Sequence, residues 1–378
     1  MNFLLLLAAS LLPPSGPFPI GRITVHWTDS ARLEPNASPR EIVVDVWYPA
    51  APSTGPNAPY LDFAAYSRLL SESALRQQLR ESYETAKTLN THAIAGAPFA
   101  NGRKRCPVLI FSPGGGMIRE LYAVQFEEYA SHGYVVAAIS HPYDAFLTIL
   151  PDGKHIAYDG KRWPAAPSLE GEWNRNKLDW HAADIRFVLD KLTALPFADR
   201  LDLTAVGAFG HSFGGAAAAH ACQTDQRLKA CINQDGEAGF RPFYLDDRGW
   251  GMDQAFMLIV REGPKKAPSD AEVAELKLTR PQLNDFLSRL KAYQDRALRN
   301  TGKESYRVTL QHEDTSHADF SDLLLLSNQP NRDLVIKSIQ AYTMAFFDKY
   351  LRGRPGRLLK EKLAYVESIE SFPPGNRR

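Results

Sequence analysis

The chain has 378 residues, a formal net charge of +1 at pH 7, 44% hydrophobic residues and 23% charged residues. This is the balance of a globular protein that buries a core, and the length suits an α/β fold with insertions. Because no stretch is strongly basic, the charge pattern gives no indication of a nucleic-acid partner.

An apolar run opens the chain, since Phe3 to Leu12 read FLLLLAASLL. A membrane-spanning helix needs about 20 residues, whereas the hydrophobic region of a secretory signal has about this length. No Lys or Arg precedes the run and no A-x-A cleavage site follows it, so a short buried terminus is the alternative. We expect residues 1–16 to act as an export signal or anchor, with a cytoplasmic protein as the alternative, and residues 17–378 to form the folded domain.

Cys106, Cys222 and Cys231 are too few, and odd in number, for a disulfide framework. Cys222 and Cys231 could pair in an exported protein; otherwise they are buried thiols, which behave as small hydrophobes. No Cys or His spacing indicates a metal site, and we expect neither a metal nor a cofactor.

Two strand-like stretches come first, Ile23–Thr28 and Glu41–Tyr48, and they predict an antiparallel start to a sheet. A loop rich in Pro and Gly follows them. Helical patterns then occupy Tyr66–Leu70 and Ala74–Thr88.

From residue 106 onward, apolar runs of strand length alternate with helical patterns. The runs are Pro107–Phe111, Tyr134–Ile139, Leu203–Phe209, Ala230–Gln234, Phe256–Val260 and Tyr306–Gln311. Such an order predicts a mostly parallel sheet with helices on both faces, which is an α/β architecture. Helices are predicted over Lys177–Leu195, whose apolar residues line one face, and over Asp333–Leu351.

Two segments interrupt this alternation. Residues 150–174 are rich in Pro, Gly and Trp and predict a long loop, and residues 268–301 have a helical pattern. In the second segment, Thr279 and Gln282 predict a capping box for a helix that starts near Arg280. Both segments are candidate lids over a site; the alternative is that they only cover the sheet.

The residues Gly210-His211-Ser212-Phe213-Gly214 form the motif G-x-S-x-G. The apolar run LTAVGAF precedes it and the small-residue sequence GGAAAAHAC follows it, so the motif lies between a predicted strand and a predicted helix. This is the setting of a nucleophile elbow, which predicts Ser212 as the nucleophile. The alternative is a tight glycine turn with an exposed serine.

A serine nucleophile needs a base and a carboxylate that orients the base, and in this fold the chain order is Ser, Asp or Glu, then His. Asp235 follows the next predicted strand directly, which favours it as the acid. The alternatives lie in polar loops: Asp225, Asp246, Asp247 and Asp253.

Two late histidines are candidate bases, His312 directly after a strand and His317 in the loop beyond it. His211 and His220 are too close to Ser212 in sequence to serve. His141 and Asp144 also follow a strand, where they line a pocket or pack structurally, and we assign them no chemistry.

The tetrahedral intermediate requires an oxyanion hole. The backbone N–H of Phe213 is one expected donor, because it follows the nucleophile. The glycines of Ser112–Gly116 follow the strand PVLIF and allow backbone amides to approach a substrate oxygen, so this loop is expected to supply the second.

These motifs resemble the platelet-activating-factor acetylhydrolase family of α/β-hydrolases, both the secreted type and its bacterial relatives. The resemblance runs from about Pro17 to Tyr350. It is strongest in VLIFSPGGGMIRELYAVQFEEYASHGYVVAAISHPYDA, in VGAFGHSFGGAAA and in INQDG. It implies Ser212 as nucleophile, Asp235 as acid and His317 as base, with the amides of Gly115 and Phe213 as the oxyanion hole.

The resemblance also implies an activity, the calcium-independent release of short or oxidised acyl chains from the sn-2 position of phospholipids. Bacterial relatives are often general carboxylesterases. The stretch GEAGFRPFY after Asp235 differs from the animal enzymes. We therefore expect a small-molecule or lipid ester as substrate, with peripheral contact to membranes or lipid aggregates. The alternatives are an amide or polyester hydrolase with the same triad and a non-catalytic lipid-binding relative.

Overall fold

The structure is a computed structural model and describes residues 11–61, 89–102, 105–160, 172–236, 251–261, 269–275, 279–311, 315–325 and 331–375. The helical patterns predicted at 66–70 and 74–88 lie outside these residues.

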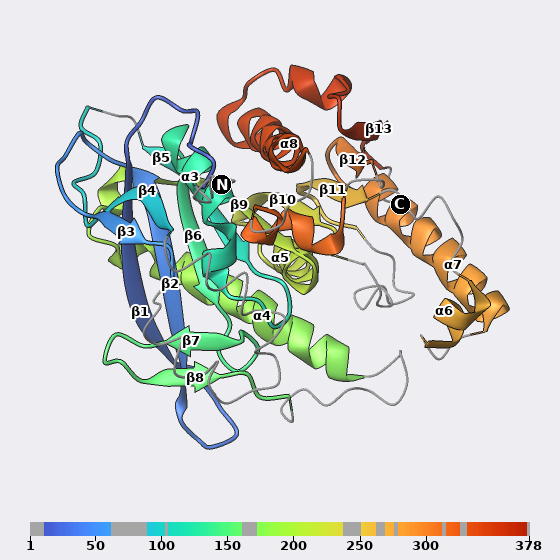
Figure 1. Ribbon diagram of the computed structural model, residues 1–378, viewed down its shortest axis with the longest axis horizontal. Coiled ribbons are helices and arrows are strands. Elements are labelled where there is room, and N and C mark those ends of the chain that lie inside the picture. The colour runs from blue at the N-terminus through green and yellow to red at the C-terminus, as the bar shows by residue number, and fades with distance from the viewer. Residues whose placement is uncertain are drawn as a thin grey trace, which may run out of the picture.

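A central sheet of 11 strands, in the order β13-β12-β11-β10-β9-β5-β6-β2-β1-β4-β3, organises the molecule (Figure 1). The predicted apolar runs all form strands, and these strands pair in parallel. They are β5 (Cys106–Ser112), β6 (Val135–Ser140), β9 (Leu201–His211), β10 (Leu228–Gln234), β11 (Ala255–Arg261) and β12 (Ser305–Leu310). The expected α/β-hydrolase architecture, a mostly parallel sheet between helices, is confirmed.

Both margins of the sheet contain antiparallel strands. The predicted antiparallel start is confirmed, because β1 (Ile20–Leu33) pairs with β2 (Pro39–Pro49), which then pairs with β6. The sequence reading did not identify β3 (Asn57–Pro59), β4 (Asn90–Ala95) and the edge strand β13 (Val366–Phe372).

Helices cover the two faces of the sheet. The helices α3 (Ala123–Ser131) and α8 (Arg332–Arg352) lie on one face, and α4 (Glu172–Lys191) and α5 (Phe213–Thr224) lie on the other (Figure 1). Successive side chains of β5 serve both layers, since Phe111 packs in the core under α3 and α8 and Ile110 packs under α4 and α5. Short 3-10 turns complete the chain at Arg119–Tyr122, Leu192–Ala194, Ala198–Arg200, His317–Phe320, Asp322–Leu324 and Arg357–Lys360.

The two candidate lid segments contain regular structure. In the first, His155–Ala157 forms β8 and pairs with β7 (Leu147–Ile149), which corrects the prediction of one long loop; residues 161–171 lie outside the description. The second contains α6 (Asp270–Glu275) and α7 (Arg280–Arg299). The capping box of Thr279 and Gln282 is present, and α7 runs outward from the sheet edge with α6 at its far end (Figure 1).

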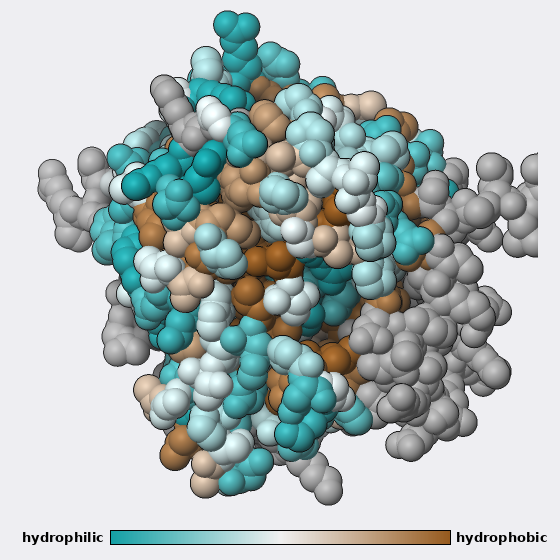
Figure 2. All heavy atoms as spheres, turned by 90° about the vertical axis from the view of Figure 1, so that its left-hand side faces the viewer, coloured by the Kyte–Doolittle hydropathy of each residue, from teal (hydrophilic) through white to brown (hydrophobic). Residues whose placement is uncertain are grey.

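The amino-terminal residues that the structure describes pack on the domain. Leu11 is buried in the core, and Ser15 donates hydrogen bonds to Glu128 of α3 through its amide and hydroxyl, at 2.8 and 2.6 Å. None of the described helices is both long and apolar enough to cross a membrane. On the side of the molecule that carries β1 to β4, hydrophobic side chains gather in a hollowed central area that hydrophilic ones surround (Figure 2).

Candidate active site

The carboxyl ends of neighbouring parallel strands bring the predicted site residues together. Ser112 ends β5, Ser212 follows β9, Asp235 follows β10, and the segment with His317 comes after β12. Since these strands are parallel neighbours, their carboxyl ends meet at one edge of the sheet, where α/β proteins bind ligands.

Ser212 occupies a sharp turn between β9 and α5, as the motif predicted. Its backbone has φ 53° and ψ −128°, a strained conformation for a residue with a side chain. A Cβ atom on Gly210 would collide with the backbone of Gly214, and one on Gly214 would collide with the carbonyl oxygens of Ser112 and Pro113. The two flanking glycines therefore allow the elbow to fit under the loop that follows β5.

Ser212, His317 and Asp235 form a continuous hydrogen-bonded chain. The Ser212 Oγ lies 2.9 Å from His317 Nε2, and His317 Nδ1 lies 2.6 Å from Asp235 Oδ2. Asp235 is almost completely buried, whereas the His317 side chain is 37% exposed, so a substrate could reach the imidazole and the serine. This is the geometry in which a histidine can take the proton of a serine hydroxyl.

The other candidate acids and bases lie elsewhere or outside the described residues. Asp225 forms an ion pair with Arg227 at the opposite end of β10, and His220 bonds to Asp179 on α4. Asp246, Asp247 and His312 lie outside the described part of the chain.

His211 precedes the nucleophile and has a supporting position. Burial lowers the pKa of His211 to about 3, and the neighbouring His317 contributes to the same shift, so His211 is neutral at physiological pH. Its Nδ1 lies 2.9 Å from the Tyr122 hydroxyl, which also accepts the Gly114 N–H at 3.2 Å. Tyr122 thus links the loop after β5 to the residue beside Ser212.

The predicted oxyanion residues lie next to each other. A Cβ atom built on Gly115 would be 3.7 Å from the Cβ of Phe213, which is ordinary van der Waals contact. The Gly114 N–H already donates to the Tyr122 hydroxyl. The next N–H along the loop is that of Gly115. This placement supports Gly115 and Phe213 as neighbouring donors, which remains a prediction.

A second Ser–His–Asp chain lies beneath this loop. The Ser112 hydroxyl is 2.8 Å from His141 Nε2, and His141 Nδ1 is 2.7 Å from Asp184 Oδ2. Arg40 binds the Asp184 carboxylate with two nitrogens, at 2.7 and 2.6 Å. At most 1% of Ser112, His141 or Asp184 is exposed, so this chain cannot meet a substrate and instead holds the loop in place.

Lys177 of α4 lies close to the predicted oxyanion residues. Its Nζ forms an ion pair with Asp144 and stands 4.6 Å from the centre of the Phe213 ring. The same nitrogen would be 3.5 Å from a Cβ atom on Gly115. Asp144, to which the sequence assigned no chemistry, therefore pairs with a cation beside both predicted donors.

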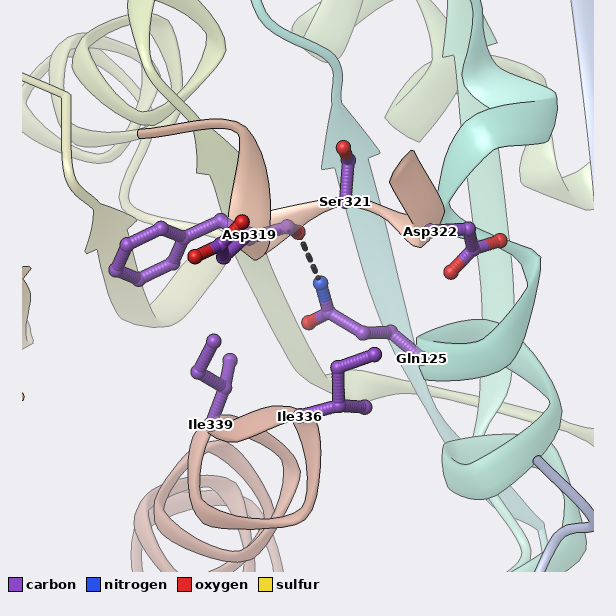
Figure 3. A pocket seen from close by; sticks show the side chains of 7 residues that line it. Gln125, Asp319, Ser321, Asp322, Ile336 and Ile339 are labelled. Carbon is purple, nitrogen blue, oxygen red and sulfur yellow. Dashed lines mark hydrogen bonds between the residues drawn. The ribbon is translucent and has the colours of Figure 1, made fainter. Parts of the chain in front are cut away.

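A polar network anchors the segment that carries His317. Gln125 of α3 donates a hydrogen bond to the Phe320 carbonyl at 2.8 Å (Figure 3). Gln125 also accepts a hydrogen bond from Gln234 at 3.0 Å. Around this contact is a small pocket lined by Gln125, Asp319, Phe320, Ser321, Asp322, Ile336 and Ile339. Because Gln234 precedes Asp235, these hydrogen bonds fix the segment of His317 relative to Asp235.

The sheet, the elbow and the chain order of Ser, Asp and His define the α/β-hydrolase fold. Within that fold, residues 9–157 match the family of platelet-activating factor acetylhydrolase, isoform II. That match includes the loop after β5 and ends before the triad. The resemblance inferred from the sequence is thereby confirmed.

Individual relatives support the same relationship. A probable 1-alkyl-2-acetylglycerophosphocholine esterase of Arthroderma benhamiae is 30% identical over 250 residues, or 60% of this chain and 59% of that protein. The platelet-activating factor acetylhydrolase of Cavia porcellus is 28% identical over 216 residues, 50% of this chain and 49% of the relative. The matches thus span from 49% to 59% of the length of these relatives.

A solved structure matches nearly the whole chain. The ferulic acid esterase of Streptomyces cinnamoneus has 27% identity and a TM-score of 0.70, and the match covers 96% of this chain and 99% of that one.

Sequence reasoning missed Arg261, whose Nε lies 2.7 Å from Asp235 Oδ2. The sequence could have indicated Arg261, because it directly follows the predicted strand Phe256–Val260, whose carboxyl end lies at the same edge of the sheet as the triad.

Proposed function

We propose that this protein hydrolyses carboxylic esters through an acyl intermediate on Ser212. The observation that carries the proposal is the hydrogen-bonded chain from Ser212 through His317 to Asp235 at the edge of the sheet. The names of the relatives described above, two esterases and an acetylhydrolase, support the choice of bond.

In the proposed mechanism, His317 accepts the Ser212 proton as Oγ attacks the ester carbonyl. The amides of Gly115 and Phe213 stabilise the negative oxygen of the tetrahedral intermediate. His317 then returns the proton to the leaving alcohol, and water repeats the sequence to release the acid. Asp235 holds the imidazole in the orientation that both steps require.

The first test concerns the nucleophile. Replacing Ser212 by Ala should lower kcat on a p-nitrophenyl ester by up to about 10⁶, as in comparable triads. A fluorophosphonate probe should label the Ser212 peptide and not the peptide with Ser112, although both serines hydrogen-bond to a histidine. Substantial activity in Ser212→Ala, or labelling at Ser112, would refute the assignment. If no serine is labelled, the alternative of a non-catalytic lipid-binding relative is favoured over the esterase.

Two classes of ester are supported by different observations. The curated relatives favour a short acyl chain on a phospholipid, while the full-length structural match favours an aromatic acyl group. Comparing kcat/KM for 2-acetyl phosphatidylcholine, longer sn-2 homologues and methyl ferulate separates them. The phospholipids differ only in the length of the acyl chain, and methyl ferulate carries an aromatic acyl group on a small alcohol. A steep optimum at two to four carbons supports the phospholipid class and, with it, contact with lipid surfaces.

The same assay decides between esters and the other bonds that a serine triad can cleave. Matched anilide and polyester substrates should turn over far more slowly than p-nitrophenyl acetate. Faster turnover of either would favour the amide or polyester alternative.

We also propose that the protein is exported. The apolar run Phe3–Leu12 and the disulfide between Cys222 and Cys231 support this location, because disulfides persist in oxidising compartments. Fractionation of the producing cells tests it, and recovery of the folded protein from the cytoplasm alone would contradict it.

A further inference from the structure

The loop that carries the Gly115 N–H is held on both sides of that residue. Before it, the Ser112 hydroxyl lies 2.8 Å from His141 Nε2. After it, the Gly116 carbonyl accepts the Phe146 N–H at 3.0 Å. Gly115 itself is exposed, so a substrate can approach its amide. The direction of this proposed oxyanion donor therefore depends on where its neighbours hold the loop.

The backbone of Ser112 also lies against the turn that carries the nucleophile. A Cβ atom on Gly210 or Gly214 would stand 2.5 or 2.1 Å from the Ser112 carbonyl oxygen. A shift of Ser112 would thus change the position of the Gly115 amide relative to Ser212. Such a change matters because misplacing a catalytic group by about 1 Å can cost about 10²-fold in rate.

Buried side chains fix the His141 ring from two directions. Its Nδ1 lies 2.7 Å from Asp184 Oδ2, and Arg40 binds the same carboxylate through two nitrogens. The His181 ring stacks on its face, with the ring centres 3.9 Å apart and an interplanar angle of 8°. All four residues are at most 1% exposed, so close packing leaves the ring little freedom to turn.

We propose that His141 is a positioning residue for the oxyanion hole and acts through the Ser112 hydroxyl. This inference rests on the proposed function of the triad. Because His141 is buried, it holds the loop without touching the reacting atoms. Its loss should raise the energy of the transition state more than that of the bound ester, since negative charge on the oxygen develops only as the new bond forms.

The test uses two esters that differ in one atom. In p-nitrophenyl thionoacetate, sulfur replaces the carbonyl oxygen of p-nitrophenyl acetate, and sulfur is a weak hydrogen-bond acceptor that gains little from an oxyanion hole. Ser112→Ala removes only the hydroxyl, and His141→Gln removes the ring. For each variant we expect kcat to fall by about 10- to 100-fold on the oxygen ester, with KM nearly unchanged, and by less than about threefold on the thionoester.

Three comparisons separate positioning from a general loss of stability. Ser305→Ala is the matched control and should change neither rate, because Ser305 is as buried as Ser112 and donates to the Leu298 carbonyl at the amino end of β12. Ser112→Ala/His141→Gln should lose no more than the larger single loss, since both residues act through one hydrogen bond. The inhibition constant of a trifluoromethyl ketone, whose adduct carries the same negative oxygen, should rise as kcat falls.

A folded Ser112→Ala variant with wild-type kcat on the oxygen ester would overturn the proposal. Equal losses on both esters, or additive losses in the double variant, would overturn it as well. If the wild type hydrolyses no ester, the proposed function fails and this inference fails with it. If His141→Gln does not fold, Ser112→Ala decides alone. If wild-type turnover of the thionoester is too slow to measure, the ketone decides, and an unchanged inhibition constant beside a reduced kcat would contradict the role of His141.

Discussion

Ser212 holds a backbone conformation that few side chains adopt, and its glycine neighbours differ in what they tolerate. Gly214 has no room for a Cβ atom, because the carbonyl oxygens of Ser112 and Pro113 occupy that space. Gly115, in the facing loop, would place a Cβ atom at ordinary contact distances, 3.5 Å from Lys177 and 3.7 Å from Phe213. An alanine should therefore be tolerated at Gly115 and should disrupt the packing at Gly214.

Gly214→Ala should destabilise the protein by about 1–3 kcal/mol, the cost of overpacking a close contact, and should greatly reduce kcat by displacing Ser212. Gly115→Ala is the matched control and should change the free energy of unfolding by less than about 1 kcal/mol. Urea unfolding of both variants measures the difference. Equal stabilities would show that the loop after β5 can move away from the elbow.

The individual residues of the triad could be predicted from the sequence, because Ser212 and Asp235 each follow a predicted strand and His317 lies in the loop after another. It could not predict Arg261 or the second chain of Ser112, His141 and Asp184, because these contacts join separate strands and a helix. The two Ser–His–Asp chains differ in burial, and burial depends on the whole fold.

At the scale of elements, α4 places a cation beside the predicted oxyanion residues. Lys177 Nζ lies 4.6 Å from the Phe213 ring centre and near Gly115, so it adds positive potential where the intermediate is expected to become negative. Lys177→Met keeps the length of the side chain and removes the charge. We expect kcat to fall by about 10-fold with little change in KM, which is the signature of an interaction made in the transition state.

The affinity for a trifluoromethyl ketone should fall with kcat in Lys177→Met, because its adduct carries the same negative oxygen. Lys191→Met is the control: it lies at the end of the same helix, 5.3 Å from the ring centre of Phe187, and should leave both values unchanged. A rise in KM alone would show that Lys177 binds the substrate.

The segment with His317 rests on a buried carboxyl group. Burial raises the pKa of Asp322 to about 7, and the charge of Glu127 acts in the same direction, while hydrogen bonds from Val124 and Tyr60 oppose the shift. A pKa raised in the folded state means that the folded protein retains this proton after the unfolded chain has lost it. The contribution of Asp322 to the free energy of unfolding is thus fully present below about pH 4 and is lost as the pH rises to about 7.

Asp322→Asn should remove this dependence. Its melting temperature minus that of the wild type should rise between pH 4.5 and pH 7 and become constant above about pH 8. Glu367→Gln, an exposed carboxyl on β13, is the control and should track the wild type at every pH. A constant difference for Asp322→Asn would mean that Asp322 is ionised in the folded protein throughout.

The elements themselves were predictable in the centre of the sheet and less so at its margins. The central strands β5, β6, β9, β10, β11 and β12 have continuous apolar runs in the sequence, because both faces of the sheet are covered there. Strand β13 reads VESIESF, and its side chains at the sheet edge are mostly exposed or half-buried. Its antiparallel pairing with β12 is a tertiary contact that a local pattern does not reveal.

At the scale of the whole molecule, the disulfide links the helix that follows Ser212 to the strand that precedes Asp235. Cys222 lies on α5 and Cys231 on β10, while Cys106 is buried and lies outside this bond. The bond thus restrains the two elements that place Ser212 and Asp235. The sequence left this pairing open, because nine residues of separation do not determine whether a helix and a strand bring two cysteines together.

The chain should therefore contain one reactive thiol when it is denatured without reductant and three after reduction. The double variant Cys222→Ala/Cys231→Ala should lose about 2–3 kcal/mol of stability, because the short closed loop no longer restricts the unfolded chain. Cys106→Ala is the matched control and should leave the bond and its thiol count intact. Three thiols in protein purified from the exported fraction would exclude the disulfide and remove one of the two supports for export. One thiol in that fraction, and three in protein made in a reducing cytoplasm, would show that the bond forms only in the oxidising compartment.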